Sequence, residues 1–127
     1  MAQRGKGAIV TVASVVGVAG GPLHAYGPAK AALLNLTQGL AAEWGRSGVR
    51  VNAVSPGFVE TPAVARGVAE HVLDPARMAG ASALGRMVQP GEIAAAVAFL
   101  ASDDASFMTA SQFVVDGGIT GAYVTPL

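Results

Sequence analysis

Three stretches of this chain have the apolar, β-branched pattern of strands in a parallel sheet. They span residues 8–14, 49–54 and 112–116. The first two are apolar at successive positions, so both faces of each strand are expected to be buried. The third is short and runs into Asp116-Gly117-Gly118, which has the composition of a turn. The pattern therefore predicts three strands of one parallel sheet.

Two longer segments have the periodicity of helices. Residues 25–45 carry large apolar side chains at three- and four-residue spacing, namely Leu33, Leu36, Leu40 and Trp44. Pro28 is compatible with this helix only in the first turn, where its missing N–H is harmless. Residues 90–102 form a second, alanine-rich helix, which Pro90 opens and in which Glu92 lies near the positive end of the helix dipole.

Residues 58–88 are less regular, because prolines and glycines interrupt their short apolar patches. They predict two short helices with connecting loops, a kind of segment that often forms a lid over a substrate. The order strand, helix, strand, insertion, helix, strand indicates the α/β class with a parallel sheet. At 127 residues the chain is expected to form one domain.

Composition and charge exclude several classes of partner. The chain is 52% hydrophobic and 13% charged, which is ample for a core, and its formal net charge is zero. Neither nucleic acid nor an anionic membrane is expected to bind, since both require a basic surface. The absence of cysteine removes disulfides, thiolate catalysis and cysteine-based zinc sites. His24 and His71 are far apart and have no acidic cluster beside them, so no metal site is expected.

The same sequence argues against a membrane or secretory location. No segment reaches the roughly 18 continuous apolar residues of a membrane-spanning helix. The apolar run after Lys6 superficially resembles a signal peptide, but Ser14 interrupts its strand pattern. We therefore expect a cytoplasmic protein.

The most informative chemical feature is the pair Tyr26 and Lys30, which stand four residues apart. On a helix these positions share a face, so the phenol and the ammonium group reach one site. A cation beside a phenol stabilises the phenolate and lowers the tyrosine pKa from about 10 towards neutrality. Tyr26 is thus a candidate general acid/base for an alcohol or carbonyl substrate, and the Ser14 hydroxyl is a candidate to polarise the same oxygen.

A Tyr-x-x-x-Lys motif alone has little specificity, but its surroundings form a longer pattern. In order along the chain, this pattern consists of the strand ending at Ser14 with Gly17 three residues later, Tyr26 with Lys30, the strand 49–54, the turn Ser55-Pro56-Gly57-Phe58-Val59-Glu60-Thr61, and Phe113-Val114-Val115-Asp116-Gly117-Gly118. In this order and spacing the chain resembles the C-terminal half of the short-chain dehydrogenase/reductase family, over roughly residues 5 to 120. Its overall character is similar to that of 3-oxoacyl-carrier-protein reductases.

The resemblance implies a set of roles. Ser14 would bind the substrate oxygen, and Tyr26 would transfer the proton. Lys30 would lower the tyrosine pKa and hydrogen-bond the nicotinamide ribose, so that both Tyr26 and Lys30 would bind the cofactor. The cofactor would be NAD or NADP, which these residues do not distinguish. The substrate would be a small alcohol or ketone. The nicotinamide segment would comprise Pro56, Gly57, Val59 and Thr61.

Other positions are weaker candidates. His24 precedes Tyr26 by two residues and is a weak substrate-binding candidate, although a solvent-facing loop histidine is favoured. Asn52 is expected to hold backbone rather than to touch a ligand. Ala110 departs from the family, which often has glycine after the threonine at this place. The helix that carries Tyr26 and Lys30 resembles one that packs against its twin in family oligomers, so a homo-oligomer is expected of the complete protein.

No glycine-rich turn opens the chain, and the family's Asn-Asn-Ala-Gly segment is absent. The sequence therefore looks like the C-terminal half of a doubly wound, Rossmann-like sheet whose dinucleotide-binding half is missing, and residues 1–127 like a partial domain. An open strand edge is expected if that half is absent. Three functions compete: the catalytic half of an NAD(P)-dependent oxidoreductase, a non-catalytic chain that pairs with a full-length relative, and a truncated product without function.

Overall fold

A computed structural model describes residues 1–122 of the chain, which form a three-stranded parallel sheet between helices. The strands are β1 (Gly7–Val12), β2 (Val49–Pro56) and β3 (Gln112–Val115), in the order β1-β2-β3. In register, Ile9 lies opposite Val51, and Val54 lies opposite Phe113. The prediction of an α/β fold with a parallel sheet is confirmed.

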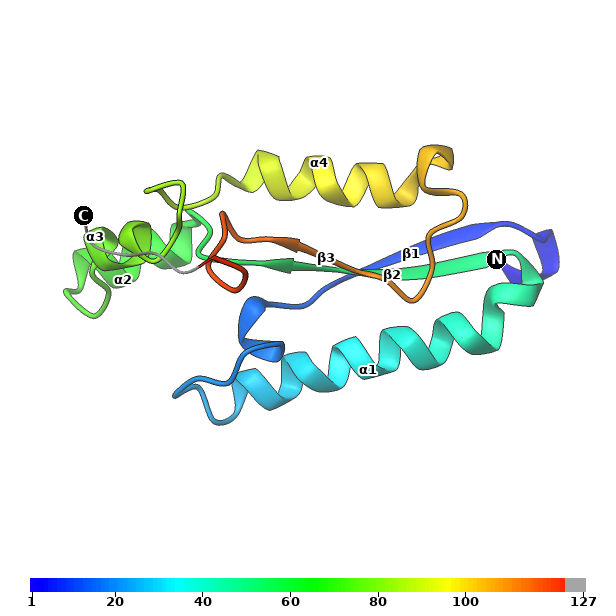
Figure 1. Ribbon diagram of the computed structural model, residues 1–127, viewed down its shortest axis with the longest axis horizontal. Helices are drawn as coiled ribbons and strands as arrows, with labels where there is room; N and C mark the ends of the chain where they lie inside the picture. The colour runs from blue at the N-terminus through cyan, green and yellow to red at the C-terminus, as the bar shows by residue number, and fades with distance from the viewer. Residues whose placement is uncertain (123–127) are drawn as a thin grey trace.

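One long helix covers each face of the sheet, α1 (Tyr26–Trp44) on one side and α4 (Pro90–Ala101) on the other (Figure 1). Below the sheet, α1 contributes Ala41, which packs with Val49 and Val51. Above it, α4 contributes Ala96 and Leu100, which pack with Val54 and Ala105. Both helices begin and end within about one residue of the ranges that the periodicity indicates, because an apolar stripe on each must face the sheet.

Buried polar groups fix the central strand to the loop before β3. The Asn52 side chain is 1% exposed; its amide nitrogen donates to the Met108 carbonyl at 2.8 Å and its oxygen accepts from the Ser111 N–H at 3.1 Å. Asn52 therefore holds backbone, as expected. The Arg50 guanidinium donates to the carbonyls of Leu100 and Ser102, both at 2.8 Å, and so satisfies carbonyls at the end of α4 that lack helical partners.

The prediction that both apolar strands are buried is right for β2 and wrong for β1. In β2 every residue except Arg50 is buried, whereas in β1 the residues are half-buried and Val12 is 47% exposed. The physical reason is position: within residues 1–122, β1 pairs with β2 alone, and no neighbour covers its other edge. The strand also ends at Val12, because Ser14 caps a short 3₁₀ turn, Val15–Gly17, through a hydrogen bond from the Val16 N–H.

The insertion between β2 and α4 contains two short helices, α2 (Pro62–Ala69) and α3 (Pro75–Gly80). Both begin with proline and are capped by a polar side chain, Thr61 for α2 and Asp74 for α3. They lie beyond the end of the sheet at which β2 and β3 terminate (Figure 1).

The remaining short 3₁₀ turns are Ala2–Arg4, Gly45–Ser47 and Asp103–Ala105. Among residues 1–122, no helix is both long and apolar enough to span a bilayer.

Candidate active site

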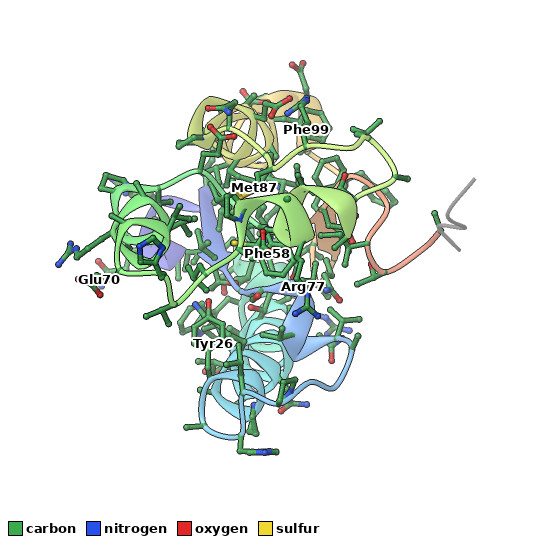
Figure 2. All side chains as sticks on the ribbon, turned by 90° about the vertical axis from the view of Figure 1, so that its left-hand side faces the viewer. Tyr26, Phe58, Glu70, Arg77, Met87 and Phe99 are labelled. Atoms are coloured by element: carbon green, nitrogen blue, oxygen red, sulfur yellow. The ribbon has the colours of Figure 1, made fainter. Side chains whose placement is uncertain are left out.

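The candidate site residues gather where the parallel strands end. β1 leads into Ser14, β2 into Gly57, and β3 into Asp116, and ligands of open α/β sheets bind outside these carboxyl ends. Figure 2 views the molecule from this end, where Tyr26 and Phe58 lie. The topology thus brings residues far apart in sequence to one edge of the sheet.

Ser14 is held close to α1 by two glycines. A Cβ on Gly17 would stand 2.8 Å from the Lys30 carbonyl carbon and 2.9 Å from the Ala31 nitrogen, and a Cβ on Gly27 would stand 3.2 Å from the Val16 oxygen. Side chains at these positions would therefore separate the 3₁₀ turn from the helix. The serine itself is 9% exposed.

Tyr26 and Lys30 lie on one face of α1, as their spacing predicts. Tyr26 is the first residue of the helix and is 48% exposed. The Lys30 Nζ lies 5.4 Å from the centroid of the tyrosine ring and donates a hydrogen bond of 2.9 Å to the Val12 carbonyl. This bond ties the first turns of α1 to the end of β1 and places a cation over the phenol ring.

One cavity of about 530 Å³ joins most of the predicted site residues. Its wall includes Ser14, Tyr26, Gly57, Val59 and Thr61. The sequence predictions missed further lining residues, which the fold brings in from four segments: Val15, Val16, Ala19, Gly20, Leu23, Phe58, Val64, Ile119 and Thr120.

Three predicted residues do not line this cavity. The Lys30 ammonium group is hydrogen-bonded to the last residue of β1, and Pro56 is buried as the last residue of β2. His24 lines a different cavity, next to Gly17 and Pro28.

Val59 lines the cavity, and its own backbone N–H and C=O have no backbone partner among residues 1–122. Val59 forms an isolated parallel bridge with Val88, in which the Glu60 N–H donates to the Val88 carbonyl and the Phe58 carbonyl accepts from the Val88 N–H. In such a bridge the N–H and C=O of Val59 itself point to the opposite side. Within residues 1–122 neither group has a backbone partner, so both are available to a ligand.

The turn after β3 is closed by the Asp116 carboxylate. It accepts hydrogen bonds from the Gly118 N–H, the Thr120 N–H and the Thr120 hydroxyl, at 2.8, 2.8 and 2.7 Å. Gly117 and Gly118 take positive φ angles of 63° and 92°, which favour glycine. Burial alone would raise the pKa of Asp116, but the bonds from Thr120, Gly118 and Ile119 together outweigh it, so this pKa lies below its ordinary value.

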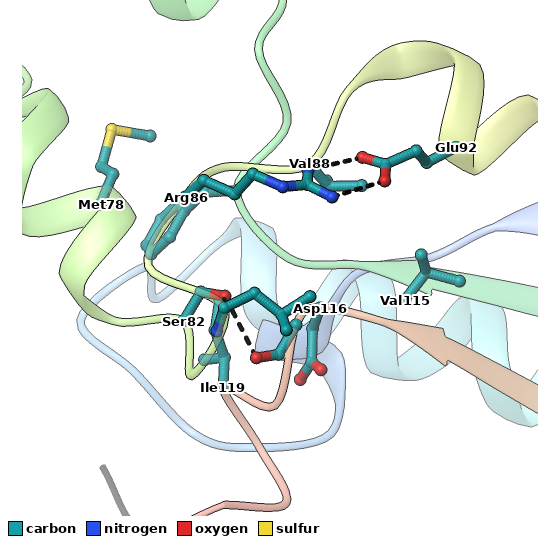
Figure 3. A pocket seen from close by; sticks show the side chains of 11 residues that line it. Met78, Ser82, Arg86, Val88, Glu92, Val115, Asp116 and Ile119 are labelled. Atoms are coloured by element: carbon teal, nitrogen blue, oxygen red, sulfur yellow. Dashed lines mark hydrogen bonds and ion pairs between the residues drawn. The ribbon is translucent and has the colours of Figure 1, made fainter. Parts of the chain in front are cut away.

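A second, smaller cavity of about 80 Å³ lies between this turn and the insertion (Figure 3). On one side of it, the Ser82 hydroxyl donates to the Gly117 carbonyl at 3.1 Å. On the other, Arg86 forms a bidentate pair with Glu92 at 2.7 and 2.8 Å. The hydrogen bond from Arg86, aided by the Gln89 N–H, lowers the pKa of Glu92 to about 2. Phe58 and Ile119 line both cavities.

Metal ligands do not gather here. In the part of the chain that the structure describes, no group of three or more His, Asp or Glu side chains is placed to hold a metal ion.

The chain therefore has a parallel α/β sheet with serine and tyrosine hydroxyls in one cavity at its carboxyl edge. Comparison with known proteins identifies its family. Residues 1–120 match the family model described as enoyl-(acyl carrier protein) reductase. The 4-formylbenzenesulfonate dehydrogenase TsaC1/TsaC2 of Comamonas testosteroni is 51% identical over 92% of this chain and 48% of its own length. The cyclohexanol dehydrogenase of an Acinetobacter species is 44% identical over 91% and 44%.

Solved structures give the same fold. An oxidoreductase of the short-chain dehydrogenase/reductase family from Burkholderia thailandensis is 39% identical, with a TM-score of 0.88 over 96% of this chain and 47% of that one. A Brucella melitensis 16M structure described as ribose-5-phosphate isomerase is 54% identical, with a TM-score of 0.93 over 96% and 47%. The chain belongs to the short-chain dehydrogenase/reductase family, and it spans about half the length of the curated relatives it matches.

Proposed function

We propose that this chain carries the proton-transfer site of an NAD(P)-dependent oxidoreductase that interconverts a secondary alcohol and a ketone. In the oxidising direction, Tyr26 takes the proton of the substrate hydroxyl as the ketone forms. A bound oxidised nicotinamide would accept the hydride that leaves the carbinol carbon, so the products would be the ketone, the reduced nicotinamide and one proton. The observation that carries the proposal is that the hydroxyl-bearing residues Ser14 and Tyr26 line one cavity.

The proposed roles follow from position and chemistry. Tyr26 transfers the proton, and Ser14 holds the substrate oxygen. Lys30 supplies a positive charge 5.4 Å from the centroid of the Tyr26 ring. The bond from Lys30 to the Val12 carbonyl fixes that charge in place.

The residues at the end of β2 fit a nicotinamide. A carboxamide needs one acceptor and one donor, and the Val59 C=O and N–H supply both. Gly57 leaves room for close approach, and the Thr61 hydroxyl still has its proton to donate while its oxygen caps α2. When bound, the nicotinamide accepts or donates the hydride. A relative supports this fit: ElxO, 28% identical with a TM-score of 0.90, has been solved with NADP bound. The proposal covers NAD and NADP alike.

The test begins with the polypeptide as its source cells express it, which is purified and whose intact mass is measured by mass spectrometry. This protein is mixed with NAD⁺ or NADP⁺ and with simple secondary alcohols, while binding and reduction of the nicotinamide are both recorded. The proposal predicts alcohol-dependent reduction together with nicotinamide binding. Binding of neither nucleotide would contradict it and would favour the alternative of a non-catalytic chain, which co-purification with a full-length relative would then support.

A second candidate function rests on one observation, the 54% identity to the protein described as ribose-5-phosphate isomerase. An isomerase of this kind moves protons between carbon and oxygen without a net redox change, so it consumes no nicotinamide. Aldose–ketose interconversion in the absence of nucleotide, with no alcohol-dependent reduction, would favour this candidate over the oxidoreductase.

A further inference from the structure

The polar side chains of the Ser14–Tyr26 cavity are all hydroxyls, and Thr120 already donates its proton to the Asp116 carboxylate. The Thr61 oxygen accepts the Val64 N–H, and its proton is assigned above to the nicotinamide. The hydroxyl protons of Ser14 and Tyr26 have no protein acceptor within residues 1–122, so the polar side-chain contact left for a substrate is concentrated on these two groups.

The other side chains of the wall are hydrocarbon and carry no charge. Its larger side chains are those of Val15, Leu23, Phe58, Val64 and Ile119. No lysine, arginine or histidine of residues 1–122 lines the cavity, and the nearby Lys30 ammonium is bonded to the Val12 carbonyl. A carboxylate, sulfonate or phosphate placed against this wall would lose its hydration without gaining a cation. A hydrocarbon skeleton would gain free energy by leaving water.

Ile119 occupies a distinctive place in that wall. Its Cδ1 lies only 2.9 Å from the position that a Cβ on Gly57 would take, and it lines both the large cavity and the small one. The turn that carries it is anchored twice, by the Asp116 carboxylate from within and by the Ser82 hydroxyl from the insertion (Figure 3). Ile119 is therefore a fixed apolar surface beside the segment assigned to the nicotinamide.

We infer that the substrate is an uncharged, largely hydrocarbon secondary alcohol or the corresponding ketone, and that Ile119 sets the size of the skeleton admitted. The inference rests on the proposed function, because it describes the substrate of the same site. Ile119 would thus determine specificity from outside the insertion between β2 and α4.

The test measures kcat/KM with two matched pairs of alcohols and records nicotinamide binding in parallel. 4-Hydroxycyclohexanecarboxylate and its methyl ester differ in charge, while cyclohexanol and 4-tert-butylcyclohexanol differ in bulk. The wild-type protein is expected to prefer the ester to the carboxylate by at least about 10-fold, since an unpaired charge is rejected more strongly than extra bulk. Val64→Lys, which places a cation in the wall, is expected to shift this ratio towards the carboxylate by about 10-fold.

Ile119→Ala is expected to raise the ratio of kcat/KM for 4-tert-butylcyclohexanol to kcat/KM for cyclohexanol by about 10-fold, because the smaller side chain opens space for several methyl groups. The matched control is Val114→Ala, an exposed aliphatic position on β3 that lines neither cavity, which should leave the ratio unchanged.

The outcomes separate the two claims. An ester-to-carboxylate ratio of one or less, or nicotinamide binding without turnover of any neutral alcohol, overturns the substrate class. If Ile119→Ala and Val114→Ala have the same ratio of kcat/KM for 4-tert-butylcyclohexanol to kcat/KM for cyclohexanol, the role of Ile119 is overturned. Failure to bind either nucleotide overturns the proposed function itself.

Discussion

The sheet with its two long helices and the insertion at residues 57–89 are held in different ways. In β2 every residue but Arg50 is buried, and paired strands and packed helices surround it. In the insertion only Met78 and Ser82 are buried. The Val59–Val88 bridge joins the two ends of the insertion to each other. The insertion is attached to the rest of the molecule by the Ser82–Gly117 hydrogen bond and the Arg86–Glu92 ion pair.

This difference separates the proposed chemistry from substrate selection. Ser14, Tyr26 and Lys30 are placed by the sheet and α1, where positions are fixed by packing. Phe58 and Val64 come from the insertion and supply hydrocarbon surface. A change in the sheet should therefore affect the rate for every substrate, whereas a change at Phe58 or Val64 should affect mainly which substrate is used.

The largest effect on catalytic rate is expected from Tyr26→Phe, which removes one hydroxyl from the residues that the sheet and α1 position. The rate of alcohol oxidation should fall by about 10²- to 10⁴-fold, since this is the typical contribution of a positioned acid/base. Nicotinamide binding, followed by fluorescence, should remain. Equal losses of rate and of binding would show that Tyr26 acts on the fold and not on the proton.

Gly17→Ala tests whether close packing on α1 places Ser14. Its methyl group would stand within 3.0 Å of the Lys30 backbone, so the variant should lose about 1–3 kcal/mol of unfolding free energy as well as catalytic rate. Gly21→Ala in the same loop meets nothing within 4 Å and is the control. Chemical denaturation and kcat are measured for both; identical behaviour of the two variants would refute the packing argument.

Ser82→Ala tests the attachment of the insertion to the turn after β3. The loss of its bonds to the Gly117 carbonyl and the Leu84 N–H should cost about 1 kcal/mol locally. Proteolysis within residues 57–89 should become faster, with little change in global unfolding. Ser106→Ala, at an exposed serine, serves as control. If the free energy of global unfolding falls by as much as the free energy of local opening, the insertion and the sheet unfold together.

The smallest effect concerns the Arg86–Glu92 pair, which is half-exposed. Because the pKa of Glu92 is lowered to about 2, the pair contributes fully above the unfolded-state value of about 4.3. That contribution disappears as the pH falls through about 2. Carbon NMR titration of the Glu92 carboxyl measures this directly. In Arg86→Gln the pKa of Glu92 should rise part of the way towards its ordinary value, since the Gln89 N–H still donates to the carboxylate. If it does not rise, Arg86 is not the main cause of the lowered pKa.

The elements of the fold could be predicted because each rests on a local signal. The 25–45 periodicity and the prolines at the starts of α2, α3 and α4 mark helix positions that depend on nearby residues alone. The error at β1 arose because apolar residues on both faces do not reveal whether a neighbouring strand is present.

Site residues that belong to a short sequence motif could be predicted, whereas those that only the folded chain brings to the cavity could not. Ser14, Tyr26 and Gly57 stand in short motifs, and the structure places them in one cavity. Ile119 and Thr120 follow Asp116-Gly117-Gly118, whose positive-φ glycines signal a turn but not the cavity that the turn meets. That contact depends on the pairing of β3 with β2, which joins residues about 60 positions apart.

The most direct test of the central claim is transfer of deuterium from an alcohol labelled at its carbinol carbon. The labelled alcohol and the oxidised nicotinamide are incubated with the protein as its source cells express it, and the reduced nicotinamide is analysed by mass spectrometry. The account predicts one deuterium in the reduced nicotinamide, with transfer slowed by Tyr26→Phe and not by Val114→Ala. Ketone formation with no deuterium in the nicotinamide, or no reduction of the nicotinamide at all, would contradict it.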